Sequence, residues 1–544
     1  MATLFLRRGR RIDVRTTLVV GAFALWFASL AGSWLQIVHL PLSIGALVAV
    51  WVGVPVVTAA VVLLRESRTP ALPVVAGGAL AVLGALLLAA LLATVPAVGV
   101  AIPALVVAAI VTHRFPAASL VLIFALASAY GSIQAFTGLP PGQLADFVIG
   151  GLWVGVAGRA LLSRRQIGIR VTPALLLLLG LLGVTLIVVP FSGGFVPALK
   201  SFRMSYWHMS VLLLVGYGGF MALRFGRLSK AITVVALAAA GYAALRWAIG
   251  HPAGKESALV PSYQVQYNQV GVGEAKVQGS FPDGQELALW IACVVPFLGA
   301  TAIWSRGWQR RLACLAIPLA AFAMFGSGQR TAVAALVAGL ATIVVVDLLS
   351  RGYRGPRVAI ALGSVVAIIF TAVVVFPLVV NNPDKRQRYE NLLHPSQDLS
   401  FQERLDKWRQ VFADLRGHPL GFGLGTGDIS AVPQRLPGLA ADNIDSAYLK
   451  IAYEQGLAVM ALFILALFVL LAELVRFAIW TRAPGRAAFA VAAAGTLVSM
   501  MVEFVAGIHI DSFASTTGWI IVGLGVAQYA ARRPDAAPRL ASPT

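Results

Sequence analysis

Residues 457–471 read LAVMALFILALFVLL, an apolar run without a single charged side chain. It is one of many such runs in a chain of 544 residues, of which 59% are hydrophobic and only 12% charged. The runs lack the alternation of a half-buried strand and the stripe of a surface helix, so they need a hydrocarbon solvent. The sequence therefore predicts an all-α polytopic membrane protein and excludes a soluble globular fold.

The apolar runs define the expected spans and the organisation of the chain. Because a span needs about 20 residues and some runs are short, we expect about 12–16 transmembrane helices. A bundle at 16–380, with outside loops 192–206 and 249–284, is followed by a large loop at 381–446 and by helices at 447–531. The candidate spans are 16–38, 42–64, 72–95, 97–113, 117–137, 144–163, 171–191, 207–224, 231–248, 285–304, 311–326, 332–350, 357–380, 447–472, 485–508 and 513–531.

Charge placement orients the spans. If residues 1–15 are cytoplasmic, the connections that face the cytoplasm hold most of the basic residues, whereas basic and acidic residues nearly balance on the other side. This distribution follows the positive-inside rule. It predicts cytoplasmic termini, a cytoplasmic tail at 532–544 and an extracytoplasmic loop at 381–446, in a multi-pass protein of the inner (plasma) membrane.

The same placement explains the net charge of +20 without a nucleic-acid partner. The two cysteines, Cys293 and Cys314, both lie in apolar runs, so we expect buried thiols and no disulfide framework. The sequence shows no cluster of metal-ligand residues, and we expect neither a metal nor a cofactor.

The loop at 381–446 is expected to contain an amphipathic helix. Its apolar residues recur at spacings of three and four from Phe401 to Leu415, with Ser400 as the expected N-cap. A glycine-rich turn follows at 421–427. Such a turn is either a surface turn, which we favour, or a loop whose amides bind phosphate.

A pair of carboxylates lies where the chain re-enters the membrane. Asp442 and Asp445 are three residues apart, so one helical face could present both. One or the other could cap the helix expected at 447–472. Alternatively, a carboxylate at the membrane interface could act as a general base.

Arg330 stands in a very short break between two spans, on the side where positive charge is least expected. It could direct its guanidinium to the interface, or bind an anion together with the amides of a helix start. Glu503 is another charge inside a span, and it could be a partner of Arg330, a structural group within the bundle or a catalytic group.

Three of these segments together resemble the O-antigen ligase and O-antigen polymerase superfamily of bacterial membrane glycosyltransferases. The first is Ser327-Gly328-Gln329-Arg330-Thr331-Ala332, the second combines the helix from Glu403 to Trp408 with His418-Pro419-Leu420-Gly421-Phe422-Gly423-Leu424-Gly425, and the third is Asp445-Ser446-Ala447-Tyr448-Leu449 with Glu454 and Gly456 downstream. The resemblance covers roughly residues 275 to 475.

The resemblance implies a metal-independent glycosyl transfer from a glycan on undecaprenyl pyrophosphate, with a glycan acceptor and room for a chain-length regulator as partner. Arg330 and Arg404 match the arginines that hold the pyrophosphate, and guanidinium groups suit a leaving phosphate. Asp445, with Asp442 in reserve, stands where ligases carry a histidine. Trp408, Tyr448, Gly423 and Gly425 have supporting roles.

The missing histidine favours a polymerase, or an enzyme of exopolysaccharide or teichoic-type assembly, over a ligase. Three other classes remain open: a transporter or flippase of lipid-linked glycans, a peptidoglycan-type membrane glycosyltransferase, and a scaffold of an export complex. A transporter built on repeats would carry paired broken helices in its two halves, and no such repeat is visible in the sequence.

Overall fold

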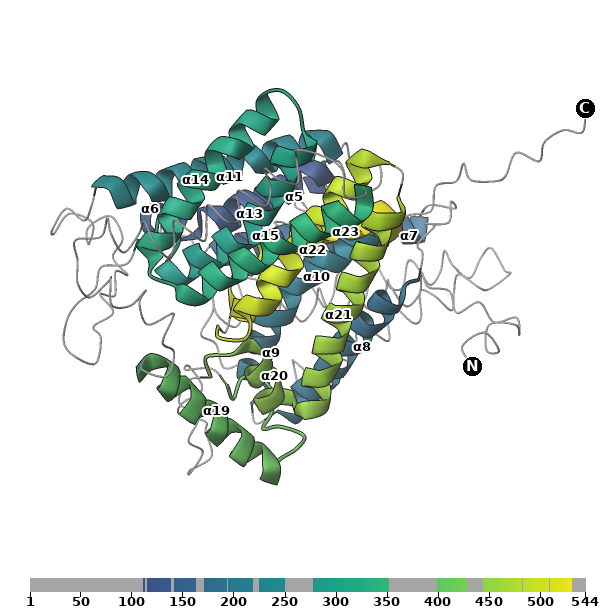
Figure 1. Cartoon of the computed structure of the whole chain (residues 1–544). Coiled ribbons are helices and arrows are strands. Elements are labelled where there is room, and N and C mark those ends of the chain that lie inside the picture. The colour runs from purple at the N-terminus through teal and green to yellow at the C-terminus, as the bar shows by residue number, and fades with distance from the viewer. Residues whose placement is uncertain are drawn as a thin grey trace, which may run out of the picture. The chain divides into compact units, whose positions relative to one another are not determined.

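Long apolar helices make up most of the structure, a computed structural model that describes residues 111–112, 115–137, 141–162, 171–192, 194–218, 225–249, 277–351, 399–427, 444–481, 483–507 and 509–530 (Figure 1). These residues contain helices and no strand, which confirms the all-α class. The expected spans before residue 97 and at 357–380, residues 250–276 of the expected loop and the termini lie outside them.

The described helices follow the expected spans closely in most places. They are α5 (Pro116–Ser128), α6 (Tyr130–Thr137), α7 (Pro141–Leu162), α8 (Pro173–Val188), η2 (Val189–Phe191), α9 (Phe195–Phe202), η3 (Arg203–Trp207), α10 (His208–Tyr217), α11 (Phe225–Ile249), α13 (Gly284–Trp304), α14 (Trp308–Ser327), α15 (Arg330–Arg351), α19 (Leu399–Gly417), α20 (Ala447–Gln455), α21 (Leu457–Trp480), α22 (Pro484–Glu503), η8 (His509–Asp511) and α23 (Ser515–Ala530).

Seven helices in this part of the chain are long and apolar enough to cross a membrane, namely α8, α11, α13, α14, α15, α21 and α22. The described residues fall into two units: most of α7 belongs to the smaller, whereas residues 120–142 and those from 168 onward form the larger. All residues of the candidate site lie in the larger unit.

Small residues let the helices of the larger unit pack closely. Ser499 of α22 donates to the carbonyl of Ala335 in α15 at 2.9 Å, and Thr496 donates to the carbonyl of Cys293 in α13 at 2.8 Å. A Cβ on Gly495 would stand 2.7 Å from Ile343 of α15. Small residues and hydroxyls at such contacts are typical of packing between membrane helices.

The expected outside loop at 192–206 is mostly helical. From Phe195 the chain runs through α9, the π-helical turn η3 and α10 without a break. The polar residues that suggested a loop point into the protein: Ser201 and Ser205 are buried and bind Glu454 and Asp511. The segment is polar for a helix within the bundle because these hydroxyls bind partners that are distant in the sequence.

The expected single helix at 447–472 is two helices. Gly456 has φ +92°, which ends α20 and starts α21 in a new direction. The buried polar residues of α20, Lys450, Glu454 and Gln455, precede the break, whereas α21 is almost entirely apolar. The cysteine prediction is also wrong in part: Cys293 is buried, but Cys314 is exposed on α14, which lies at the edge of the bundle.

Candidate functional site

The N-terminal end of α20 brings a carboxylate and a guanidinium together. Asp445 Oδ2 lies 3.6 Å from Nε of Arg404 in α19, and each side chain is 27% exposed. This distance is within ion-pair range but too long for a good hydrogen bond, so an Asp445 oxygen keeps capacity to accept a proton. Two residues predicted from sequence for catalysis and for phosphate binding therefore meet in space.

Asp445 is held by its neighbours rather than by a helix of its own. It precedes α20, whose N-cap is Ser446: the Ser446 hydroxyl accepts from the amide of Leu449 and donates to the carbonyl of Phe504. The amide of Ala447 donates to the carbonyls of Phe504 and Gly507, each at 3.0 Å. The capping interpretation of Asp445 is therefore wrong, as is a shared helical face, and Asp442 lies outside the described residues.

Arg404 is positioned by the packing of α19 on α20. Val411 and Leu415 of α19 form a buried cluster with Ile444, Leu449 and Tyr453, while Trp408 packs at its edge. The helix begins at Leu399, so Ser400 lies within its first turn and does not cap it. Figure 1 shows α19 outside the packed bundle, at the end where α9 and α20 lie.

Arg330 lies at the same end of the bundle. It starts α15 two residues after Gly328, whose φ of +69° closes α14. Ser499 of α22 contacts Ala335 whereas Gly495 contacts Ile343, so these two helices are antiparallel at this point. At about 1.5 Å per residue, the first residue of α15 is level with the last residues of α22, to which the start of α20 is bonded.

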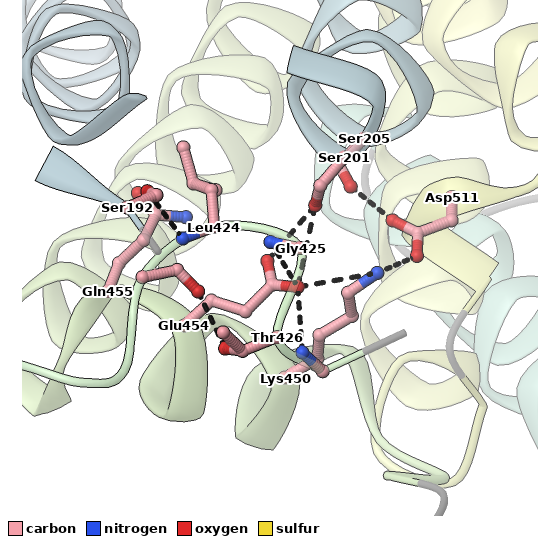
Figure 2. Close-up of polar contacts among 12 residues, drawn as sticks. Ser192, Ser201, Ser205, Leu424, Gly425, Thr426, Lys450, Glu454, Gln455 and Asp511 are labelled. Carbon is pink, nitrogen blue, oxygen red and sulfur yellow. Dashed lines mark hydrogen bonds and ion pairs between the residues drawn. The ribbon is translucent and has the colours of Figure 1, made fainter. Parts of the chain in front are cut away.

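The glycine-rich turn packs against the protein, with Leu424, Gly425 and Gly427 buried and its other residues half-buried, which contradicts the favoured surface-turn interpretation. The amides of Gly425 and Gly427 donate to Oε1 of Glu454 at 3.1 and 3.2 Å, as Figure 2 shows for Gly425. The turn is thus an anion-binding nest whose anion is a carboxylate of the same chain.

The supporting residues predicted from sequence have structural roles. Gly423 and Gly425 have φ of +96° and +85°, and a Cβ on either would stand within 3 Å of the segment Ser192–Pro197. Tyr448 donates to the carbonyl of Met501 at 2.9 Å, and burial raises the pKa of Tyr448, so this donor keeps its proton. Trp408 contributes by packing.

A buried ionic cluster escaped the sequence analysis. Lys450 lies between Asp511 and Glu454, while Ser201 and Ser205 bind the two carboxylates (Figure 2). Lysine and glutamate at i and i+4 could have suggested one pair, but the link to Asp511 spans 61 residues and no sequence pattern predicts it. The π-helical turn with its buried Arg203 also escaped, because π-turns have no sequence signature.

These features define a multi-pass, all-helical membrane protein with an ionic site at one end of its helices. Residues 314–464 match the family model Wzy_C, described as O-Antigen ligase. The match runs from α14 into α21 and contains Arg330, Arg404 and Asp445. It confirms the resemblance to the O-antigen ligase and polymerase superfamily and indicates a membrane glycan-processing enzyme. No curated protein matches the chain.

Among the described residues, no group of three or more His, Cys, Asp and Glu side chains could hold a metal ion. Near the start of α20, the groups available for chemistry are the carboxylate of Asp445 and the guanidinium groups of Arg404 and Arg330. A carboxylate can accept a proton, and guanidinium groups can stabilise phosphate oxygens as negative charge develops on them. The site therefore has the parts of a proton acceptor and of an anion-binding surface.

Proposed function

We propose that this protein polymerises or transfers a glycan carried on undecaprenyl pyrophosphate, at the outer face of the inner (plasma) membrane, and that polymerisation is the reaction. The carrying observation is the distance of 3.6 Å between Asp445 and Arg404, with both side chains partly exposed. Such a pair supplies a base and an anion-binding group within reach of one small reacting centre.

The reaction is an inverting transfer. Asp445 accepts the proton of an acceptor hydroxyl while that oxygen attacks the anomeric carbon of the donor sugar. The bond from this carbon to the carrier pyrophosphate breaks, and the electron pair leaves with the pyrophosphate. Arg404 and Arg330 bind the phosphate oxygens and stabilise the leaving group as its charge develops.

Substrate binding and activation of the base are coupled through Arg404. The guanidinium group that pairs with Asp445 in the free protein is also the group that binds the pyrophosphate. Phosphate oxygens compete for its donors, since they form stronger bidentate contacts than an ion pair at 3.6 Å. Arrival of the donor therefore draws Arg404 toward the phosphate and leaves Asp445 to the acceptor hydroxyl.

The choice of a polymerase rests on the group that stands in the base position. Ligases of the superfamily carry a histidine where this chain has Asp445, and this position lies inside the matched residues 314–464. Polymer products would support this choice, whereas a single transfer to a second acceptor would support ligation.

The test is reconstitution of the full chain in vesicles with a lipid-linked oligosaccharide. We expect release of carrier pyrophosphate together with products that grow by whole repeat units. A flippase would move the labelled lipid across the bilayer without releasing the carrier, and a scaffold would do neither. Absence of carrier release from a folded, correctly inserted protein would overturn the proposal.

A further inference from the structure

The helix α20 is short, yet it is buried on nearly all sides. Its residues Lys450, Glu454 and Gln455 are at most 4% exposed, although all three are polar. Gln455 accepts from Thr185 of α8 at 2.8 Å and donates to Tyr206 of η3. Burial of so many polar groups is costly unless each is paired, so their partners fix the position of the helix.

Lys450 ties α20 to the connection between α22 and α23. Its ammonium group pairs with Asp511 and lies 3.8 Å from Oε1 of Glu454. The other carboxylate oxygen of Asp511 accepts from Ser205 of η3. The same connection holds the start of α20 through the carbonyls of Phe504 and Gly507. The connection therefore holds the first turn of α20 at both of its ends.

Glu454 ties α20 to the glycine turn. Besides the amides of Gly425 and Gly427, it accepts from Ser201 of α9 at 3.1 Å. The backbone carbonyl of Glu454 accepts from the amide of Gly423 at 2.9 Å. These bonds are directional, whereas the apolar contacts between α19 and α20 are not. The register of α20 along its axis is thus set by the ionic cluster.

We propose that Lys450, Glu454 and Asp511 are positioning residues that hold Asp445 opposite Arg404. The inference rests on the proposed function, because Asp445 is the base of that reaction. Asp445 lies next to the N-cap of α20, so a shift of the helix moves its carboxylate relative to α19. A misplacement of about 1 Å can lower a catalytic rate by about 100-fold.

The experiment compares Lys450→Met with the double variant Lys450→Met/Asp511→Asn. The single variant removes the Lys450 ammonium group from the buried Glu454 and the half-buried Asp511, and it should lower the thermal midpoint strongly. The double variant removes one positive and one negative charge, so the cluster keeps its original net charge. The protein should then regain most of the thermal midpoint that the single variant loses. We expect its kcat to stay about 10- to 100-fold low while KM is nearly unchanged.

Two further variants separate positioning from stability. Glu454→Gln keeps an oxygen that can accept from both glycine amides, so it should retain more kcat than Glu454→Ala. Glu473→Gln is the matched control: this carboxylate also accepts two hydrogen bonds, from Ala174 and Tyr529, but lies about 25 Å along α21 from Gly456. It should lower the midpoint and leave kcat unchanged.

A distance measurement makes the test independent of turnover. In a Cys314→Ser background, the pair Arg404→Cys and Asp445→Cys should be joined by a short bifunctional thiol reagent, and Lys450→Met/Asp511→Asn should reduce the yield. If kcat recovers together with the midpoint, or if cross-linking is unchanged in the double variant, the positioning proposal is overturned. If the parent protein releases no carrier, the proposed function fails, and cross-linking still decides the positioning.

Discussion

Two ion pairs, each with at least one member in the segment from Asp445 to Glu454, differ mainly in their access to solvent. Arg404 and Asp445 lie 3.6 Å apart and are each 27% exposed, whereas Lys450 and Glu454 lie 3.8 Å apart and are 2% and 3% exposed. Similar distances therefore accompany opposite surroundings. Under the proposed function, the partly exposed pair exchanges its partner for a substrate, whereas the buried pair of Lys450 and Glu454 stays closed to solvent.

The difference also sets the energetic role of each pair. A partly exposed pair adds little to stability, roughly 0–1 kcal/mol at the surface. A buried charge that loses its partner costs about 3–5 kcal/mol, because it stays desolvated and uncompensated. Substitutions in the partly exposed pair should therefore change catalysis at nearly constant stability, and substitutions in the buried cluster should change stability first.

The largest effect is expected from Asp445→Asn. An amide cannot accept the proton of the acceptor hydroxyl, so turnover should fall by about 10²–10⁴-fold, while the carrier still binds. Carrier release and carrier binding, measured on the same vesicles, check this prediction. The matched control is Asp406→Asn, which removes an exposed carboxylate of α19 paired with Arg409 at 2.9 Å. Full activity of the Asp445 variant would reject this residue as the base.

The next largest effect is a loss of stability in the buried region around Glu454. Gly425→Ala forces a side chain onto a backbone with φ +85° and places its Cβ 2.7 Å from the carbonyl oxygen of Pro197. We expect a loss of about 3 kcal/mol in the free energy of unfolding, from backbone strain and displacement of Glu454. Thermal or denaturant unfolding measures it. Gly417→Ala, where a Cβ meets nothing within 4 Å, should be nearly neutral.

A smaller effect is expected when the ion pair of Asp445 and Arg404 loses its guanidinium group. Arg404→Ala should weaken binding of the carrier pyrophosphate about tenfold, since charge-assisted hydrogen bonds to phosphate are lost. The control is Arg409→Ala on the same helix, which removes an arginine that is 78% exposed. Equal losses from both variants would mean that α19 attracts phosphate by charge alone and that Arg404 has no special position.

The smallest effect is a pH dependence in α19 itself. Burial raises the pKa of Asp414 above its ordinary value, although His418 lowers it in part. The folded state then binds the proton more tightly than the unfolded state, so this group contributes stability at low pH that is lost as pH rises through its folded pKa. Asp414→Asn should flatten the fall of the thermal midpoint above pH 3.8, and an unchanged pH profile would contradict it.

The sequence predicts those parts of the molecule that depend on local pattern. The run expected at 332–350 is the helix Arg330–Arg351, because apolar side chains must face lipid or other helices along its whole length. The resemblance also singled out Arg404 and Asp445, which lie together. The contact between Ser201 and Glu454 could not be predicted, since it joins residues 253 positions apart and depends on how the bundle closes.

The left-handed turn at Gly456 has a consequence for membranes of different thickness. A span adjusts to a thicker or thinner bilayer mainly by changing its tilt, at a modest cost per ångström of mismatch. The helix α21 is the most apolar of the described spans, and only 33% of its apolar window is buried, so lipid acts on it directly. Because Gly456 separates α21 from α20, we expect a change in the tilt of α21 to reach the ion pair at the start of α20 less than it would along one continuous helix.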